Sequence, residues 1–108
     1  DHRDLHAFPT RRSSDLGTGR VMSTKQEGDS IIFRIKVPKR LYRYIVEKGF
    51  VAVDGISLTV VKRGASSFTL AVIPYTLNNT NLPSLSVGDW VNLEADILAK
   101  YVESLLDR

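Results

Sequence analysis

The fold is decided by the stretch Phe50-Val51-Ala52-Val53-Asp54-Gly55-Ile56-Ser57-Leu58-Thr59-Val60. Its central Asp-Gly dipeptide readily takes the backbone of a two-residue hairpin turn, and it lies between two runs rich in β-branched residues. The stretch therefore predicts a tight turn between two antiparallel strands. In the second strand, the two-residue period places Ser57 and Thr59 on one face and the apolar residues on the opposite face.

Short β-rich runs continue on both sides of this hairpin. The clearest is 30–37, where the apolar residues at alternate positions share one face. Strands are expected at 20–25, 30–37, 50–53, 56–62, 66–73 and 90–96. Residues 17–19 are expected to open a loop, 39–46 to form a short helix, and 75–82 a helical turn and loop. Six short strands at this spacing predict an all-β protein, namely a small six-stranded antiparallel barrel with short helices.

The C-terminal segment has helical periodicity. Leu98, Tyr101, Val102 and Leu105 recur at spacings of three and four residues, so 98–106 is expected to form a helix with one apolar stripe. Such a stripe needs a partner surface. It packs either across an open end of the barrel or against other subunits.

Composition excludes several classes of protein. The chain has 108 residues, 43% of them hydrophobic and 25% charged, which is typical of one globular domain rather than a disordered chain. It contains no cysteine, so a disulfide framework and a zinc-thiolate site are excluded. No apolar run approaches the roughly 18 residues of a membrane span, and no secretory signal is visible. These features favour a cytoplasmic protein. The net charge of +3 is too small to indicate nucleic acid.

The first sixteen residues differ from the rest of the chain. Phe8-Pro9-Thr10-Arg11-Arg12-Ser13-Ser14-Asp15-Leu16 is what TTC CCT ACA CGA CGC TCT TCC GAT CT encodes, a string that resembles a sequencing adapter. We therefore interpret residues 1–16 as a translated artefact rather than native protein. Its removal takes away three of the 15 basic and three of the 12 acidic residues, and both histidines. A barrel at 17–97 and a helix at 98–108 remain.

A few residues could carry chemistry, although each also has an ordinary structural explanation. Ser57 and Thr59 could hydrogen-bond the polar edge of a planar ligand, or simply face solvent. Lys48 could stand at a pocket rim or be a solvated charge. Pro74 could expose backbone groups to a ligand or only end a strand. Asp96 could act on a substrate or cap the helix that follows it. The sequence shows neither a phosphate loop nor a cluster of metal ligands.

Four strings, taken in order, resemble the lumazine-binding repeat of riboflavin synthase. They are 17–21, 48–60, 73–80 and 87–96, and the second and the trailing helix are more similar to the enzyme's C-terminal repeat. The resemblance implies a homotrimer whose subunits carry two six-stranded Greek-key barrels, with the C-terminal helices at the trimer axis. Each barrel would bind one 6,7-dimethyl-8-ribityllumazine. The enzyme would convert two of them to riboflavin and 5-amino-6-ribitylaminouracil without a metal or an organic cofactor.

The resemblance also assigns site residues. The substrate-binding residues it implies are Lys48, Ser57, Leu58, Thr59, Ile73, Pro74, Tyr75, Thr76, Leu77 and Asn78. Asp96 matches an aspartate with a suspected assisting role in catalysis. This chain departs from the family in two ways: it lacks the family's histidine near the start of the repeat and an N-terminal barrel. It is therefore expected to bind ligand weakly and to be inactive alone.

Two other functions remain open. A non-catalytic lumazine- or flavin-binding antenna protein would share the barrel, so the sequence separates it poorly from the enzyme. A basic β-barrel that binds nucleic acid is disfavoured, because only 8% of the residues are aromatic and they do not alternate with Lys or Arg on one strand face. Neither nucleic acid nor a membrane is an expected partner.

Overall fold

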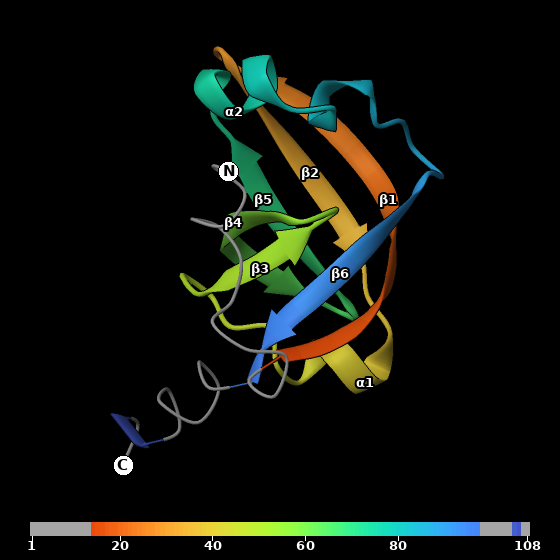
Figure 1. Cartoon of the computed structure of the whole chain (residues 1–108), viewed down its shortest axis with the longest axis vertical. Coiled ribbons are helices and arrows are strands. Elements are labelled where there is room, and N and C mark those ends of the chain that lie inside the picture. The colour runs from red at the N-terminus through yellow and green to blue at the C-terminus, as the bar shows by residue number, and fades with distance from the viewer. Residues whose placement is uncertain (1–13, 98–104, 107–108) are drawn as a thin grey trace.

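The computed structural model describes residues 14–97 and 105–106. The described chain contains six strands that close into a barrel in the order β1-β2-β5-β4-β3-β6, with every neighbouring pair antiparallel (Figure 1). The strands are β1 Ser14–Glu27, β2 Ser30–Lys36, β3 Phe50–Val53, β4 Ile56–Gly64, β5 Ser67–Val72 and β6 Trp90–Asp96. The predicted all-β antiparallel barrel is therefore confirmed.

The strand order is that of a Greek key. Strands β3, β4 and β5 follow one another through short turns, and β6 returns after a longer connection to lie beside β3. The resulting spatial order, fourth strand beside first, defines the motif. The Greek-key expectation from the family resemblance thus holds for this chain.

The β3–β4 turn has the geometry that its sequence predicts. Asp54 and Gly55 both have positive φ angles, 49° and 84°, and Val53 pairs directly with Ile56. Two central residues with positive φ define a type I′ turn, whose twist matches that of the flanking strands. Because this turn fixes the register, it also fixes which β4 side chains face the core.

Strand β1 is longer than predicted and begins earlier. It runs from Ser14 through the Gly17-Thr18-Gly19 stretch, which the sequence analysis placed in a loop. The loop prediction was wrong because these glycines serve close packing rather than a turn. A Cβ atom on Gly19 would lie 2.6 Å from Leu93 Cδ1 and 2.8 Å from the Lys36 carbonyl oxygen. The strand also includes three residues of the segment interpreted as foreign, since ladder pairing uses backbone groups that every residue but proline supplies in full.

Apolar side chains from all six strands fill the barrel. Phe33, Ile35 and Val37 are buried, as the alternation in 30–37 predicts, and Ile31 packs against them. The largest fully buried side chains are Phe33, Phe68, Ile35, Leu41, Ile45, Leu70, Leu93, Val21, Val51, Val53, Val60 and Val72. A ligand therefore has no room inside the barrel and must bind at its ends or on its outer face.

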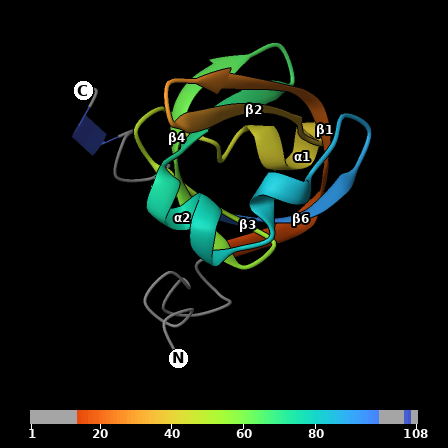
Figure 2. The same ribbon diagram turned by 90° about the horizontal axis from the view of Figure 1, so that it is seen from above.

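Short helical segments cover the two ends of the barrel (Figures 1 and 2). Helix α1, Lys39–Tyr42, lies at one end, and α2, Pro74–Asn79, and the 3₁₀ turn η3, Leu82–Ser84, lie at the other. The helix predicted at 39–46 is shorter than expected because the chain turns after Tyr42 to bury Ile45 beside Leu41.

The predicted C-terminal helix, 98–106, lies outside the described residues except at Leu105 and Leu106, which are exposed. Among the described residues, no helix has the length and apolar character needed to cross a membrane.

Candidate functional site

The two hydroxyl residues of β4 lie on the outer face of the barrel. Along the strand, Leu58 and Val60 are buried, whereas Ser57 is half-buried and Thr59 is exposed. Ser57 and Thr59 therefore share one face, as the strand period predicts, and that face points outward. A ligand held by these hydroxyls would lie against the barrel wall, not within it.

The first half of β4 also has an open backbone edge. β4 pairs with β3 from Ile56 to Thr59, but it pairs with β5 only from Val60 onward. A bulge between Val60 and Lys62 accompanies this change, and the last β5 residues, Ala71 and Val72, pair with β2 alone in the described ladders. The two strands therefore diverge toward the α2 end of the barrel (Figure 1).

The pairing pattern shows which groups face this opening. Val60 N–H donates to the Gly49 carbonyl oxygen at 2.9 Å, and the Val60 carbonyl accepts from Lys48 N–H at 2.8 Å. In an antiparallel pair, alternate residues direct both backbone groups to the partner strand and the others direct them away. By that alternation, Ser57 and Thr59 direct their N–H and C=O groups away from β3, with Thr59 at the start of the β5 ladder and Ser57 before it, where β4 has no β5 partner. We call this edge of β4, with its two hydroxyl side chains, the β4 edge.

The far side of the opening is formed by the start of α2. Ile73, the N-cap residue, and Pro74 and Tyr75 are exposed, and the Ile73 carbonyl accepts from Leu77 N–H at 3.0 Å. Thr76 and Leu77 are half-buried, and Asn78 is exposed. The topology thus places 57–59 and Ile73, the residue that follows β5, on the two sides of this opening, and 74–78 continue from Ile73 as α2.

Lys48 is exposed and lies two residues before β3. It has a positive φ of 67°, an uncommon conformation for lysine, and its backbone N–H donates to the Val60 carbonyl oxygen. Phe50, the Cα partner of Thr59, follows two residues later and is 57% exposed. Lys48 and Phe50 therefore adjoin the predicted site beside Thr59.

Asp96 is on the same face but on another strand. β6 pairs Ala95 with Val51, so Asp96 is next to Phe50 and two strands from Thr59. At about 4.8 Å per strand, the backbones of Asp96 and Thr59 are about 10 Å apart. The structure therefore does not bring Asp96 directly against the β4 edge.

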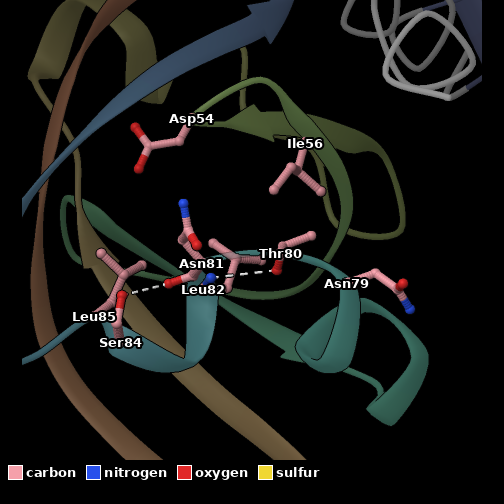
Figure 3. A pocket seen from close by; sticks show the side chains of 8 residues that line it. All are labelled: Asp54, Ile56, Asn79, Thr80, Asn81, Leu82, Ser84 and Leu85. Carbon is pink, nitrogen blue, oxygen red and sulfur yellow. Dashed lines mark hydrogen bonds between the residues drawn. The ribbon is translucent and has the colours of Figure 1, made fainter. Parts of the chain in front are cut away.

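A cavity of about 460 Å³ lies at the same end of the barrel, between the β3–β4 turn and the α2–η3 segment (Figure 3). It is lined by Asp54, Ile56, Asn79, Thr80, Asn81, Leu82, Ser84 and Leu85. None of these is a predicted site residue, although Ile56 directly precedes Ser57 and Asn79 directly follows Asn78 in the sequence. The cavity is therefore a neighbour of the predicted site rather than the site itself.

Sequence reasoning missed one residue that positions the β4 edge. The Asp54 carboxylate Oδ1 accepts from Asn92 N–H at 2.7 Å, and Asp54 N–H donates to the Asn92 carbonyl at 2.8 Å. This pair of bonds ties the β3–β4 turn to β6. The Asp-Gly signal predicted a turn, but nothing in a single sequence indicates which strand the aspartate would bind.

The described residues contain no group of three or more His, Asp or Glu placed to hold a metal ion. The available chemistry is that of backbone amides, hydroxyls, an exposed aromatic ring and one lysine. Fold and site together define a small Greek-key barrel with an open strand edge on its outer wall, suited to a planar polar ligand.

Comparison with known proteins agrees with that class. The family model "Lumazine binding domain" matches residues 16–96, and the chain belongs to this family. It is 47% identical over 90 residues to a riboflavin synthase of Actinobacillus pleuropneumoniae, which covers 83% of this chain and 42% of that protein. It is 45% identical over 92 residues to one of Mycobacterium tuberculosis (strain ATCC 25618 / H37Rv), covering 82% and 46%. The chain thus spans less than half the length of these relatives.

The fold is also similar to that of solved structures. A crystal structure of LumP complexed with 6,7-dimethyl-8-(1'-D-ribityl) lumazine superposes with a TM-score of 0.70 at 25% identity, covering 73% of this chain and 45% of that one. A structure of LumP complexed with riboflavin gives a TM-score of 0.69, with coverage of 73% and 43%.

Proposed function

We propose that this chain is the C-terminal half of a riboflavin synthase and binds one 6,7-dimethyl-8-ribityllumazine at the β4 edge. The observation that carries the proposal is the part of β4 that contains Ser57 and Thr59, which has no β5 partner before Val60 and lies within the family match. The 47% identity to a riboflavin synthase supports the enzyme rather than another lumazine-binding protein.

The chemistry of the ligand suits this edge. The pyrimidinedione part of lumazine presents carbonyl and N–H groups in one plane, and a strand edge presents alternating N–H and C=O groups. Ring and strand can therefore pair as two strands do, while the hydroxyls of Ser57 and Thr59 bind ribityl oxygens. Ile73, Pro74, Tyr75 and Leu77 then cover the ring, with Leu58 behind the edge, and Thr76 and Asn78 supply polar contacts. Lys48 places positive charge where negative charge develops on the ring.

The reaction needs two such rings. One lumazine loses a proton from its C7 methyl group, whose anion is delocalised over the ring, and a four-carbon unit passes to the second lumazine. The products are riboflavin and 5-amino-6-ribitylaminouracil. Holding the rings face to face makes a bimolecular step effectively intramolecular, which accounts for much of the rate. In this proposal the second ring is bound by the N-terminal barrel of a neighbouring subunit, so this chain alone is inactive. Asp96, on β6 two strands from β4, assists the reaction.

The remaining parts of the proposal concern organisation. In this proposal residues 1–16 are a translated adapter, and the family match, 16–96, overlaps that segment only at Leu16. Residues 98–108 form the helix that assembles a homotrimer in the whole enzyme, and the enzyme is cytoplasmic.

Binding is tested by titrating the purified chain into 6,7-dimethyl-8-ribityllumazine and following the anisotropy of the ligand's fluorescence. We expect saturable binding, weakened about tenfold or more in the double variant Ser57→Ala/Thr59→Ala, because two hydrogen bonds are lost. Thr24→Ala on β1, an exposed threonine on a strand three places from β4 around the barrel, is the matched control. Absence of binding, or equal affinity in the double variant and the control, would contradict the proposed site.

The second candidate is a non-catalytic antenna protein, favoured by the similarity to lumazine-bound LumP. The enzyme and antenna hypotheses are distinguished by adding the N-terminal half of the A. pleuropneumoniae riboflavin synthase and measuring riboflavin absorbance. The enzyme proposal expects turnover only in the mixture, reduced by Asp96→Asn. The antenna alternative expects ligand binding with no turnover in either case.

A further inference from the structure

A second pocket lies on the opposite wall of the barrel. It has a volume of about 310 Å³ and is lined by Thr18, Arg20, Lys36, Val37, Pro38 and Trp90. These residues come from β1, β2, the residues after β2, and β6. In the six-stranded ring, β1 is three strands from β4 in either direction, so this pocket and the β4 edge face opposite sides (Figure 2). No part of the proposed lumazine site contributes to it.

Two cations stand side by side in this pocket. Arg20 is the Cα partner of Lys36 on one neighbouring strand and of Trp90 on the other, so the three side chains form one row across β2, β1 and β6. All three are exposed on the outer face. Like charges directly opposite on neighbouring strands destabilise a sheet. The row is therefore an arrangement that a bound anion would stabilise.

Among residues 14–97 and 105–106, no carboxylate pairs with either of these cations. The Arg20 guanidinium lies 5.2 Å from the Trp90 ring centroid, and its Nε donates to the Gly88 carbonyl at 3.2 Å. Within the described part of the chain, the other two guanidinium nitrogens and the Lys36 ammonium have no hydrogen-bond or ion-pair partner. Asp89, beside Trp90 in sequence, accepts instead from Ser86 N–H at 2.8 Å.

We propose that this pocket binds a small organic phosphate, a phosphate monoester of a sugar or polyol. The phosphate lies between Arg20 and Lys36, where the free guanidinium nitrogens and the ammonium supply charge-assisted hydrogen bonds to a dianion. The Thr18 hydroxyl adds a neutral donor. The exposed indole of Trp90 and the ring of Pro38 form an apolar wall for the carbon skeleton, in a volume larger than a phosphate group alone requires. This site is independent of the lumazine proposal.

Trp90 is the chain's only tryptophan, so its emission reports on the pocket directly. The whole chain is titrated with D-ribose 5-phosphate, with inorganic phosphate and with D-ribose. We expect a saturable change with the ester, a weaker one with inorganic phosphate and none with ribose. Arg20→Gln and Lys36→Gln should each weaken ester binding about tenfold or more, because each removes a charged donor. Lys25→Gln, an exposed lysine elsewhere on β1, should bind like the unmodified chain.

Thermal melting gives a second, independent measurement. Lys36→Gln should raise the melting temperature in phosphate-free buffer, since it removes a like-charge neighbour, and should abolish the rise that ribose 5-phosphate gives the unmodified chain. An equal response to ester and ribose, an ester that binds no tighter than inorganic phosphate, or variants that keep the full ester response would each overturn the proposal. Lumazine binding at the β4 edge is unaffected by any of these outcomes.

Discussion

Two walls of the barrel differ in what lies beside the half-strand edge that the sheet leaves unpaired. Strand β1 pairs with β6 from Ser14 to Arg20 but with β2 only from Arg20 onward, and helix α1 lies beside its first half, where the Arg40 guanidinium donates to the Leu16 carbonyl at 2.7 Å. Strand β4 has β3 beside its first half but lacks β5 there. Yet its inward residues Leu58 and Val60 are buried. A barrel can therefore leave half a strand edge open for a ligand without exposing its core.

The opening depends on what holds the two strands apart. On one side, β5 leaves the barrel wall at Val72 and Pro74 starts α2. On the other side, the Asp54–Asn92 hydrogen bonds hold the β3–β4 turn against β6. The β1 wall is shaped by the close approach of its neighbours, and the β4 wall by the hydrogen bonds and the strand end that border its opening. The two walls should respond differently to the same kinds of substitution.

Crowding the β1 wall should have the largest effect. Gly19→Val places side-chain atoms where Leu93, Ile35 and the Lys36 carbonyl already lie within 2.8 Å of a Cβ position. Overpacking of this kind should lower the free energy of unfolding by about 3 kcal/mol, measured by urea denaturation. The adjacent Thr18→Val adds the same residue type on the exposed face and should stay within about 0.5 kcal/mol of the unmodified chain. Equal effects of the two would show that β1 does not approach its neighbours closely.

Proline should distinguish a paired amide from an open one. Asn92→Pro removes the N–H that donates to the Asp54 carboxylate and should cost about 2 kcal/mol. Thr59→Pro removes an N–H that faces the opening, and proline is tolerated at such an edge, so it should cost about 1 kcal/mol or less. Urea denaturation checks both values. Lumazine binding should be lost in Thr59→Pro even though the chain remains folded. A larger loss of stability in Thr59→Pro than in Asn92→Pro would mean that the β4 edge is paired.

The sequence predicts well which face of a strand is buried, but it predicts poorly which strand lies beside each edge. The Asp54-Gly55 turn and the alternation in β2 and β4 follow from local rules, and the structure confirms both. Residues 57–59 and 73–78 were named from motifs, and the register places 57–59 and Ile73 on the two sides of one opening. The separation of residues 57–59 from β5, however, depends on the position of the bulge between Val60 and Lys62. Side-chain periodicity carries no signal for that position, because it reports which face is buried and not which neighbour is present.

The same limit explains the errors. Gly17 and Gly19 suggested a loop because glycine is common in turns, but here their missing side chains admit Leu41, Leu93 and a backbone oxygen. The row of Arg20, Lys36 and Trp90 joins residues far apart in the sequence, and only the register between three strands reveals it. Contacts of this kind are set by tertiary pairing rather than by local propensity.

The smallest effect should come from weakening one of the hydrogen bonds that border the opening in the β4 wall. Asp54→Asn keeps an oxygen acceptor and tolerates the positive φ of 49°, but it loses the charge that strengthens the bond to Asn92 N–H. The free energy of unfolding should fall by about 1 kcal/mol, the difference between charged and neutral hydrogen bonds.

The matched control is Asp29→Asn in the exposed β1–β2 turn, which should be nearly neutral. If the turn's attachment to β6 keeps the β4 edge open, Asp54→Asn should also weaken lumazine binding several-fold while Asp29→Asn leaves it unchanged, as measured by the same anisotropy titration. Lower stability with unchanged affinity would assign the opening to the departure of β5 alone, and would remove Asp54 from the set of residues that position the ligand.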